Sequence, residues 1–287
     1  MGNSAAEAAH SSTAAHKSAE SITYYAPLVL RQGSGEPLVL LHGILCSERI
    51  WGNVVGLLSG RHDVIVPTML GHNGGQLASR RPASFEDVVD DLERLLDELG
   101  IAKAHLAGNS LGGWVALELA RRGRALTVCA LSPAGAWGSE TDGQRVRATL
   151  KRAVRDIQRS RRIAPLVAHS RHVRRFALRN SALHGERVSR PAFLLLIDDV
   201  IGCQISGDLF ESDARQTPLD PAPCPITLAW SAEDRIFPLE TYRSRACELV
   251  PGADFIVLDD VGHIPMLDDP RLVAQTILSS ATGALNG

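Results

Sequence analysis

One short glycine-rich motif in the 287-residue chain has the residue types and spacing for nucleophilic catalysis. It runs Gly108-Asn109-Ser110-Leu111-Gly112, between an apolar run at 104–107 and an apolar segment that begins at Leu111. Where a strand turns directly into a helix, glycines two residues before and after a serine make room for the tight turn and leave the hydroxyl exposed. Ser110 is therefore the candidate nucleophile.

Candidate partners for this serine follow two later apolar runs. A serine hydroxyl is a poor nucleophile at neutral pH unless a histidine, steered by a carboxylate, removes its proton. Glu233 and Asp234 come after the run 226–230, and His263 comes after the run 254–258. On residue type and position alone, either acid could orient His263.

Two backbone N–H groups are candidates for binding the negative charge that forms on an attacked carbonyl. The N–H of Leu111 opens the helix after Ser110, where the helix dipole favours negative charge. The N–H of Ile44 belongs to the loop that follows the apolar run 38–41, and Gly43 beside it permits close approach to the nucleophile. The sequence thus predicts an oxyanion hole made by Ile44 and Leu111.

The wall of the substrate pocket is assigned from fewer signals. We expect His42 to lie beside the pocket and to make structural hydrogen bonds rather than to transfer a proton. Trp137, together with the apolar run 193–197, is expected to shape an acyl or alkyl pocket. Such runs also form plain core, so the pocket remains the least specific part of the site.

These residues need a frame that brings distant segments together, and the hydropathy pattern predicts one. Short apolar runs alternate with helical segments, and Ser84 with Asp87 forms a capping pattern at one helix start. This order predicts a doubly wound parallel sheet with helices on both faces. The predicted strands are 22–30, 38–41, 63–67, 104–107, 126–131, 226–230 and 254–258, and the predicted helices are 50–58, 84–99, 111–122, 239–249 and 270–280.

The alternation stops between residues 137 and 220, where the pattern is helical throughout. We interpret this stretch as a cap inserted into a core that comprises residues 21–136 and 221–287. Residues 1–20 are mainly small and polar and are expected to form a disordered tail. The domain prediction is therefore one catalytic core with one helical cap.

Basic residues are concentrated in the predicted cap. Between Arg145 and Arg190 there are 14 Lys and Arg against Asp156 and Glu186, a formal excess of +12. A solvated helical face is the simplest explanation of such a run. Attraction of an anionic substrate or carrier is the alternative.

From about residue 22 to 283 the chain resembles the α/β-hydrolase superfamily, in particular its lidded, cofactor-free serine branch. The resemblance implies a doubly wound, mostly parallel eight-stranded sheet with an inserted helical cap. It also favours Asp234 over Glu233, because Asp234 matches the family's Asp-x-x-x-Pro arrangement, and so implies the triad Ser110, Asp234 and His263. The residues that carry the resemblance, in the family's order, are His42-Gly43, Gly108 to Gly112, Asp234 with Pro238, and Gly262-His263.

Two features depart from the family's other branches. Many relatives have an aspartate and an arginine after the strand at 64–66, whereas this chain continues with the loop 67–75, which is expected to alter the pocket wall. The serine nucleophile disfavours the family's epoxide hydrolases and haloalkane dehalogenases, because those enzymes resemble this chain but use aspartate.

Composition bounds the remaining possibilities. A net charge of −2 and a pI of about 6.6 argue against a nucleic-acid partner. No apolar run approaches the roughly 18 to 20 residues of a membrane span, so we expect no integral membrane association. Five scattered cysteines form no CxxC pair or metal-ligand spacing, which favours a reduced, cytoplasmic protein without a metal site.

Together these observations predict a carboxylesterase of EC 3.1.1 type that acts on a small-molecule acyl substrate and needs no cofactor. The basic cap makes an anionic substrate an open alternative. A thioesterase, an acyltransferase or a C–C bond hydrolase could use the same triad. A ligand-binding receptor that retains the triad is the alternative of another class. The sequence does not determine the oligomeric state.

Overall fold

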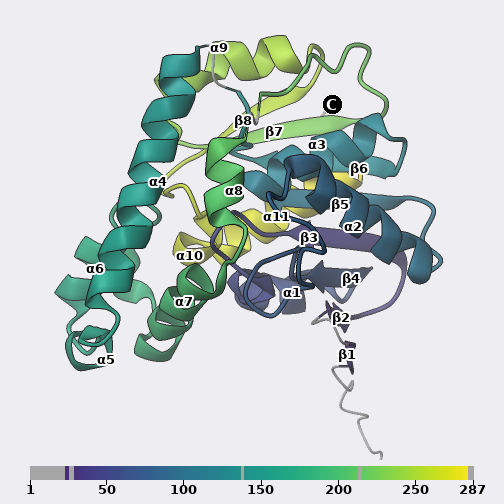
Figure 1. Ribbon diagram of the computed structural model, residues 1–287. Coiled ribbons are helices and arrows are strands. Elements are labelled where there is room, and N and C mark those ends of the chain that lie inside the picture. Colours follow the sequence, from purple (N-terminus) through teal and green to yellow (C-terminus); the bar gives the residue numbers. More distant parts are fainter. Residues whose placement is uncertain (1–22, 26–28, 137–138, 213–214, 284–287) are drawn as a thin grey trace, which may run out of the picture.

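The computed structural model describes residues 23–25, 29–136, 139–212 and 215–283, and one eight-stranded sheet lies at its centre (Figure 1). The predicted tail at 1–20 and Trp137 lie outside the described residues. The strand order is β1-β2-β4-β3-β5-β6-β7-β8. The strands are β1 (Thr23–Tyr25), β2 (Val29–Gln32), β3 (Glu36–Leu41), β4 (His62–Pro67), β5 (Ala104–Asn109), β6 (Ala125–Leu131), β7 (Ile226–Ser231) and β8 (Asp254–Leu258).

Most of the sheet is parallel. Strands β3 to β8 run parallel to their neighbours, whereas β2 is antiparallel to β4 and β1 is antiparallel to β2. The prediction of an eight-stranded, mostly parallel sheet is confirmed. The prediction of a single strand over 22–30 is wrong, because Tyr25 lies opposite Val29 and the chain reverses direction between them.

Helices cover both faces of the sheet, as the alternating pattern predicts. On β3, Val39 and Leu41 join the core under α2, α3 and α9, whereas Leu38 and Leu40 join the core under α1 and α11. Successive side chains of a strand point to opposite faces, so a strand that is apolar throughout must be covered on both. These helices are α1 (Gly52–Leu58), α2 (Phe85–Glu98), α3 (Leu111–Arg121), α9 (Leu239–Leu249) and α11 (Pro270–Ala281).

Local signals set the start of these helices. The Ser84 side chain accepts a hydrogen bond from the Asp87 N–H, and Asp87 Oδ2 accepts one from the Ser84 N–H at 2.8 Å. This reciprocal pair satisfies donors that a helix start leaves free. The predicted capping pattern is confirmed.

A run of helices lies between β6 and β7, and we call residues 139–212 the insertion. Figure 1 shows α4 to α7 beside the sheet, with α5 and α6 at the end furthest from it. Its own small core contains Ala168, Val188 and Phe193, against which Leu267 packs. The helices are α4 (Glu140–Ser160), α5 (Ala164–Val167), α6 (Arg171–Leu178), α7 (Arg190–Gly202) and α8 (Ser206–Glu211).

Parallel strands place the candidate site at one edge of the sheet. Ile44 follows β3, Ser110 follows β5, Asp234 follows β7 and His263 follows β8. Because all four strands point the same way, their carboxyl ends meet at the same edge. Residues that are 219 positions apart in the chain, Ile44 and His263, can therefore belong to one site.

Candidate active site

The turn between β5 and α3 holds Ser110 in a strained backbone conformation, with φ 56° and ψ −113°. Its N–H donates to the Leu131 carbonyl at 3.0 Å, which anchors the turn to β6. A Cβ on Gly108 would lie 2.1 Å from the Gly112 carbonyl oxygen, and one on Gly112 would lie 2.1 Å from that of Leu41. Only glycine fits at both positions, so the motif's spacing has a steric cause.

A buried histidine and carboxylate lie at the same edge. His263 Nδ1 is 2.7 Å from Asp234 Oδ2, and both side chains are almost completely buried. Asp234 Oδ1 accepts hydrogen bonds from the N–H groups of Ile236 at 2.8 Å and Phe237 at 2.7 Å. The Phe237 ring packs edge to face against the His263 imidazole, with 4.9 Å between the ring centroids. The carboxylate is thus held on one oxygen by the backbone, and its other oxygen orients the histidine.

Asn109 joins the histidine loop to the serine turn. Its Nδ2 donates to the His263 carbonyl at 2.8 Å and to the Leu131 carbonyl at 3.2 Å. Ser110, the next residue, is therefore held close to His263 across the sheet edge. The spacing of the motif places no requirement on Asn109, and only its amide group, which can donate twice, hints at this role.

The loop after β3 lies against the serine. A Cβ on Gly43 would be 3.5 Å from the Cβ of Ser110, so the glycine backbone passes next to Ser110. Neither the Ile44 N–H nor the Leu111 N–H donates a hydrogen bond to another group in the described part of the chain. Leu111 directly follows Ser110 and Ile44 directly follows Gly43, so both N–H groups are candidates for binding an oxyanion.

The His42 side chain makes two hydrogen bonds that hold this loop in place. Its Nδ1 donates to the Gly43 carbonyl at 2.8 Å, and its Nε2 accepts from the Met69 N–H at 3.0 Å. Burial, together with the neighbouring His72, holds the pKa of His42 well below its usual range. The ring is fully buried and neutral, so its contribution is to the loop's shape.

Comparison with known proteins identifies the family of this fold. A family model described as the Alpha/beta hydrolase family matches residues 38–276, which is most of the chain. This protein belongs to the α/β-hydrolase family. A relative from Mycobacterium tuberculosis named Epoxide hydrolase EphH is 33% identical over 207 residues, which cover 67% of this chain and 92% of that protein.

Solved structures of other α/β-hydrolases are similar throughout. A thermophilic esterase from Thermogutta terrifontis has a TM-score of 0.65 and 26% identity, covering 90% of this chain and 93% of that one. The 2-hydroxy-6-oxo-6-phenylhexa-2,4-dienoate hydrolase from Rhodococcus sp. strain RHA1 has a TM-score of 0.69 at 20% identity, covering 89% and 94%, and supports the fold alone. Hydrolysis is the reaction type that the family and the 26% identical esterase indicate.

A buried carboxylate, that of Asp268, joins this α/β-hydrolase core to its insertion. Asp268 is the last residue of α10 (Pro265–Asp268). It accepts hydrogen bonds from two N–H groups of the insertion, that of Leu183 at 2.9 Å and that of His184 at 2.7 Å. It also accepts a hydrogen bond at 2.8 Å from the N–H of Gly262, the residue directly before His263. Asp268 therefore fixes the loop that carries His263 and the insertion to each other.

Replacing Asp268 by asparagine is expected to lower the free energy of unfolding by roughly 1–3 kcal/mol. Three N–H donors face the carboxylate, and an amide turns its own NH₂ toward at least one of them. Urea titration followed by circular dichroism measures the loss. Asp269→Asn is the matched control, because Asp269 caps α11 and asparagine caps equally well. An equal loss in both variants would contradict the role assigned to Asp268.

A second buried carboxylate ties the other end of the insertion to the loop after β3. Asp199, on α7, accepts from Ser47 Oγ at 2.7 Å, Arg49 Nη1 at 2.6 Å and Asn73 Nδ2 at 3.0 Å. Burial raises the pKa of Asp199 above its usual range. The insertion is thus attached to the core at two points, through Asp199 to the loop after β3 and through Asp268 to the loop that carries His263.

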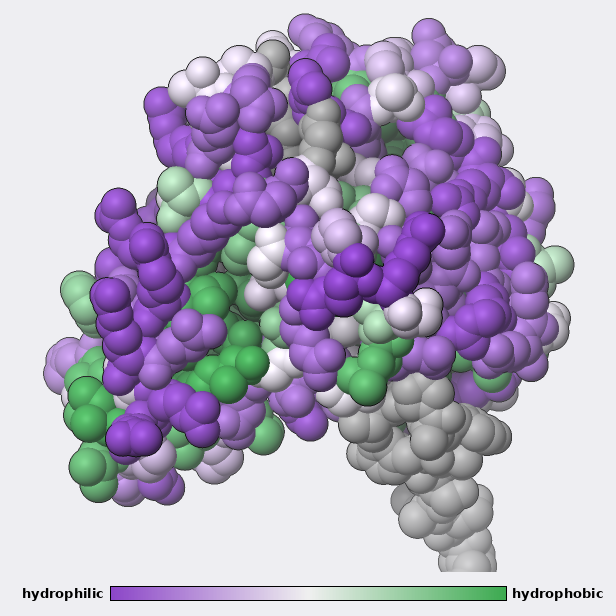
Figure 2. Space-filling view, viewed as in Figure 1, coloured by the Kyte–Doolittle hydropathy of each residue, from purple (hydrophilic) through white to green (hydrophobic). Residues whose placement is uncertain are grey.

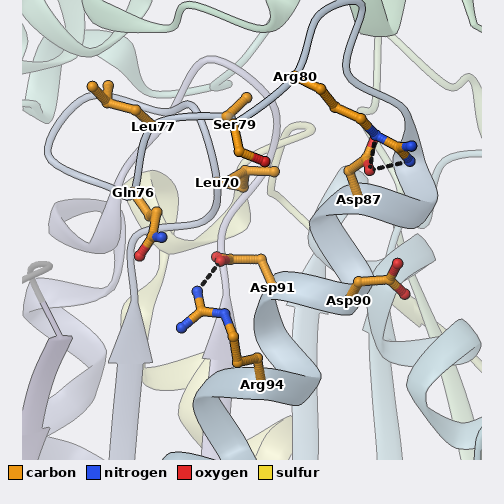
Figure 3. Close-up of a pocket in the computed structure, with 10 residues that line it drawn as sticks. Leu70, Gln76, Leu77, Ser79, Arg80, Asp87, Asp90, Asp91 and Arg94 are labelled. Atoms are coloured by element: carbon orange, nitrogen blue, oxygen red, sulfur yellow. Dashed lines mark hydrogen bonds and ion pairs between the residues drawn. The ribbon is translucent and has the colours of Figure 1, made fainter.

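A separate cleft of about 260 Å³ lies on the α2 side of the core (Figure 3). Its carboxylates are paired with arginines: Asp87 binds Arg80 at 2.6 Å, and Asp91 binds Arg94. None of its lining residues belongs to the triad or to the candidate oxyanion hole. Among the described residues, no group of three His, Cys, Asp or Glu is arranged to hold a metal ion.

None of the helices in the described ranges combines the length and the apolar character that a membrane span requires.

Proposed function

We propose that this protein is a serine hydrolase that cleaves a carboxylic ester, with Ser110 as nucleophile, His263 as base and Asp234 as the acid that orients it. The observation that carries the proposal is the 2.7 Å hydrogen bond between His263 and Asp234, beside a serine on a strained strand-to-helix turn. A neutral serine needs such a pair to become nucleophilic.

In the first half of the reaction, His263 Nε2 takes the proton of Ser110 as its oxygen attacks the ester carbonyl. The N–H groups of Ile44 and Leu111 stabilise the oxyanion, and the first turn of α3 adds its dipole. His263 then gives the proton to the departing alcohol, and an acyl-enzyme remains.

In the second half, His263 removes a proton from water, and the resulting hydroxide attacks the acyl-enzyme. Asp234 keeps the Nδ1 proton of His263 in place, so that Nε2 is the nitrogen that accepts protons in both halves. As the bond between the acyl group and Ser110 breaks, His263 returns the proton to the Ser110 oxygen, which leaves a carboxylic acid and regenerated Ser110. These residues complete the cycle without a cofactor.

Ester cleavage is favoured over epoxide opening despite the relative that is named an epoxide hydrolase. The nucleophile position of this chain holds a serine, whose attack is suited to a carbonyl and whose oxyanion the two N–H groups can stabilise. The similarity to an esterase with a TM-score of 0.65 supports the same choice.

The insertion is proposed to act as the cap over the site, with residues 137–220 as its range. Figure 2 shows hydrophobic side chains in a hollow between α4 and α7, which suits an acyl or alkyl group.

The five cysteines are free, and burial raises the pKa of Cys129 to about 12, which keeps it a thiol. Free thiols support the proposed cytoplasmic location.

The test is a substrate panel combined with active-site labelling. We expect turnover of p-nitrophenyl esters, with a rate that depends on acyl length, and an intact-mass adduct of a fluorophosphonate at Ser110. Acyl thioesters, a vinylogous diketone for C–C cleavage and styrene oxide test the competing reaction types.

Each outcome separates the alternatives. Preferred turnover of the thioester or of the diketone would keep the triad but replace the ester by that substrate class. Labelling of Ser110 without turnover of any substrate would favour a ligand-binding receptor. Hydrolysis of styrene oxide without an adduct at Ser110 would overturn the proposed mechanism.

A further inference from the structure

Two consecutive short helices of the insertion expose large apolar side chains. Leu166 on α5 is 77% exposed and Phe176 on α6 is 67% exposed, and Ile163 and Val167 are also exposed. Single exposed apolar residues are ordinary, but four within 14 residues at one end of a domain indicate an interaction surface. Figure 2 shows hydrophobic side chains there, bordered by hydrophilic ones. We call Ile163, Leu166, Val167 and Phe176 the apolar patch.

Arginines without a carboxylate partner flank the apolar patch. Arg159, Arg161, Arg162 and Arg171 are exposed and make no ion pair in the described part of the chain. Several arginines elsewhere on the surface are paired with carboxylates, as in the cluster that joins α2 and α3 through Arg122, Asp90 and Glu93. The flanking guanidinium groups therefore remain available to an external anion, and their planar forks match phosphate oxygens.

The charge of the whole chain is divided between its two parts. Residues 157–185 contain seven arginines and no Asp or Glu. Outside the stretch from Arg145 to Arg190, the chain has 16 Lys and Arg against 30 Asp and Glu, a formal charge of −14. Near a negative surface, this distribution turns the insertion toward the surface and the core away from it.

We propose that the outer end of the insertion, formed by α5 and α6, docks on the surface of an anionic phospholipid bilayer. Its apolar patch enters the interface between headgroups and acyl chains, and the four arginines bind lipid phosphates. A second copy of the chain is a poorer occupant, because it would bring the same positive charges together. A bare polyanion would leave the apolar side chains without a role.

The docking surface is directly connected to the candidate catalytic loop. Two residues after α6, the chain reaches Asn180, and the next carbonyl, that of Ser181, accepts the N–H of Ile264 at 2.7 Å. The Arg179 carbonyl accepts a hydrogen bond from Arg235, next to Asp234, at 3.1 Å. Docking through α6 would therefore hold the site next to the membrane, where apolar substrates concentrate. The docking claim itself does not depend on which bond the enzyme cleaves.

Sedimentation of the full chain with vesicles tests the proposal. Vesicles contain either phosphatidylcholine alone or three parts phosphatidylcholine to one part phosphatidylglycerol. We expect binding to the mixed vesicles and little to the neutral ones, and a loss of binding when salt rises from about 0.1 M to about 0.5 M, because screening shortens the reach of the arginines. Equal binding to both vesicle types would overturn the proposal.

Two sets of substitutions separate the apolar and the charged contributions. Ile163→Ser, Leu166→Ser and Phe176→Ser together, and Arg161→Glu, Arg162→Glu and Arg171→Glu together, are each expected to weaken binding at least ~10-fold. All six side chains are exposed, so folding should be retained. The matched controls are Leu77→Ser and Arg61→Glu, at exposed positions of the core, and they should bind like the wild type.

The rate at which each variant hydrolyses a water-soluble ester is measured as well. This rate reports on the proposed activity independently of vesicle binding. Unchanged soluble-ester rates with lost vesicle binding would support docking. Vesicle binding that depends on the arginines but not on the apolar patch would show adsorption by charge alone, and would overturn the proposed insertion of the apolar patch into the bilayer interface. Undiminished binding in both triple variants would place the contact elsewhere and overturn the proposal as well.

Discussion

Replacing Ser110 by alanine is expected to lower kcat for ester hydrolysis by roughly 10⁴- to 10⁶-fold. The hydroxyl is the atom that attacks, and alanine offers no substitute, while the N–H groups of Ile44 and Leu111 would still stabilise some charge. The fold should be unaffected, because alanine fits the same backbone and removes only one oxygen. Steady-state kinetics on the best ester of the panel, with a thermal melt of each protein, measures both effects.

The control for this change is Ser244→Ala, which removes the hydroxyl of an exposed serine on α9. It should keep both the wild-type rate and the fluorophosphonate adduct, whereas Ser110→Ala should lose both. A Ser110→Ala protein that melts normally and retains more than about a tenth of the wild-type rate would rule out a serine mechanism.

Replacing Asp234 by asparagine is expected to lower kcat by about 10⁴-fold, the second largest effect. The N–H groups of Ile236 and Phe237 both point at Oδ1, so the amide oxygen must stay there. The NH₂ group then faces His263 Nδ1, which can accept its hydrogen bond only without a proton. The proton moves to Nε2, and this nitrogen can no longer take one from Ser110.

Glu233→Gln provides the matched control at the neighbouring carboxylate. Glu233 follows the same strand, and its N–H donates to the Val261 carbonyl, but its side chain makes no hydrogen bond to His263 in the described structure. We expect a rate within about 3-fold of the wild type. If Glu233→Gln is instead the variant that loses activity, the acid has been assigned to the wrong residue.

Most strands of the sheet can be predicted from the sequence alone, because local hydropathy patterns determine them. Parallel strands buried on both faces read as apolar runs, and six of the eight strands were predicted within a few residues. The segment 22–30 was the exception. Edge strands carry a weaker hydropathy signal, and the reversal between Tyr25 and Val29 is revealed only by their pairing.

Some features of the candidate site can likewise be predicted from the sequence, and others require the structure. The steric need for glycine at positions 108 and 112 lies within the turn itself, and strand order alone indicates that Ser110, Asp234 and His263 share an edge. The choice between Glu233 and Asp234 came from a resemblance, not from local pattern. Hydrogen-bond geometry now provides a physical reason for it, since Asp234 Oδ2 lies 2.7 Å from His263 Nδ1.

What the sequence by itself determined is the family, together with the short motifs that carry the proposed reaction machinery. What only the tertiary structure decided is how the insertion is attached and which surface it exposes. Asp199 connects side chains up to 152 residues apart, whereas Asn109 and Asp268 reach backbone groups 154 and 85 residues away. Any residue supplies a backbone N–H or carbonyl, so such contacts leave no mark in the local sequence pattern.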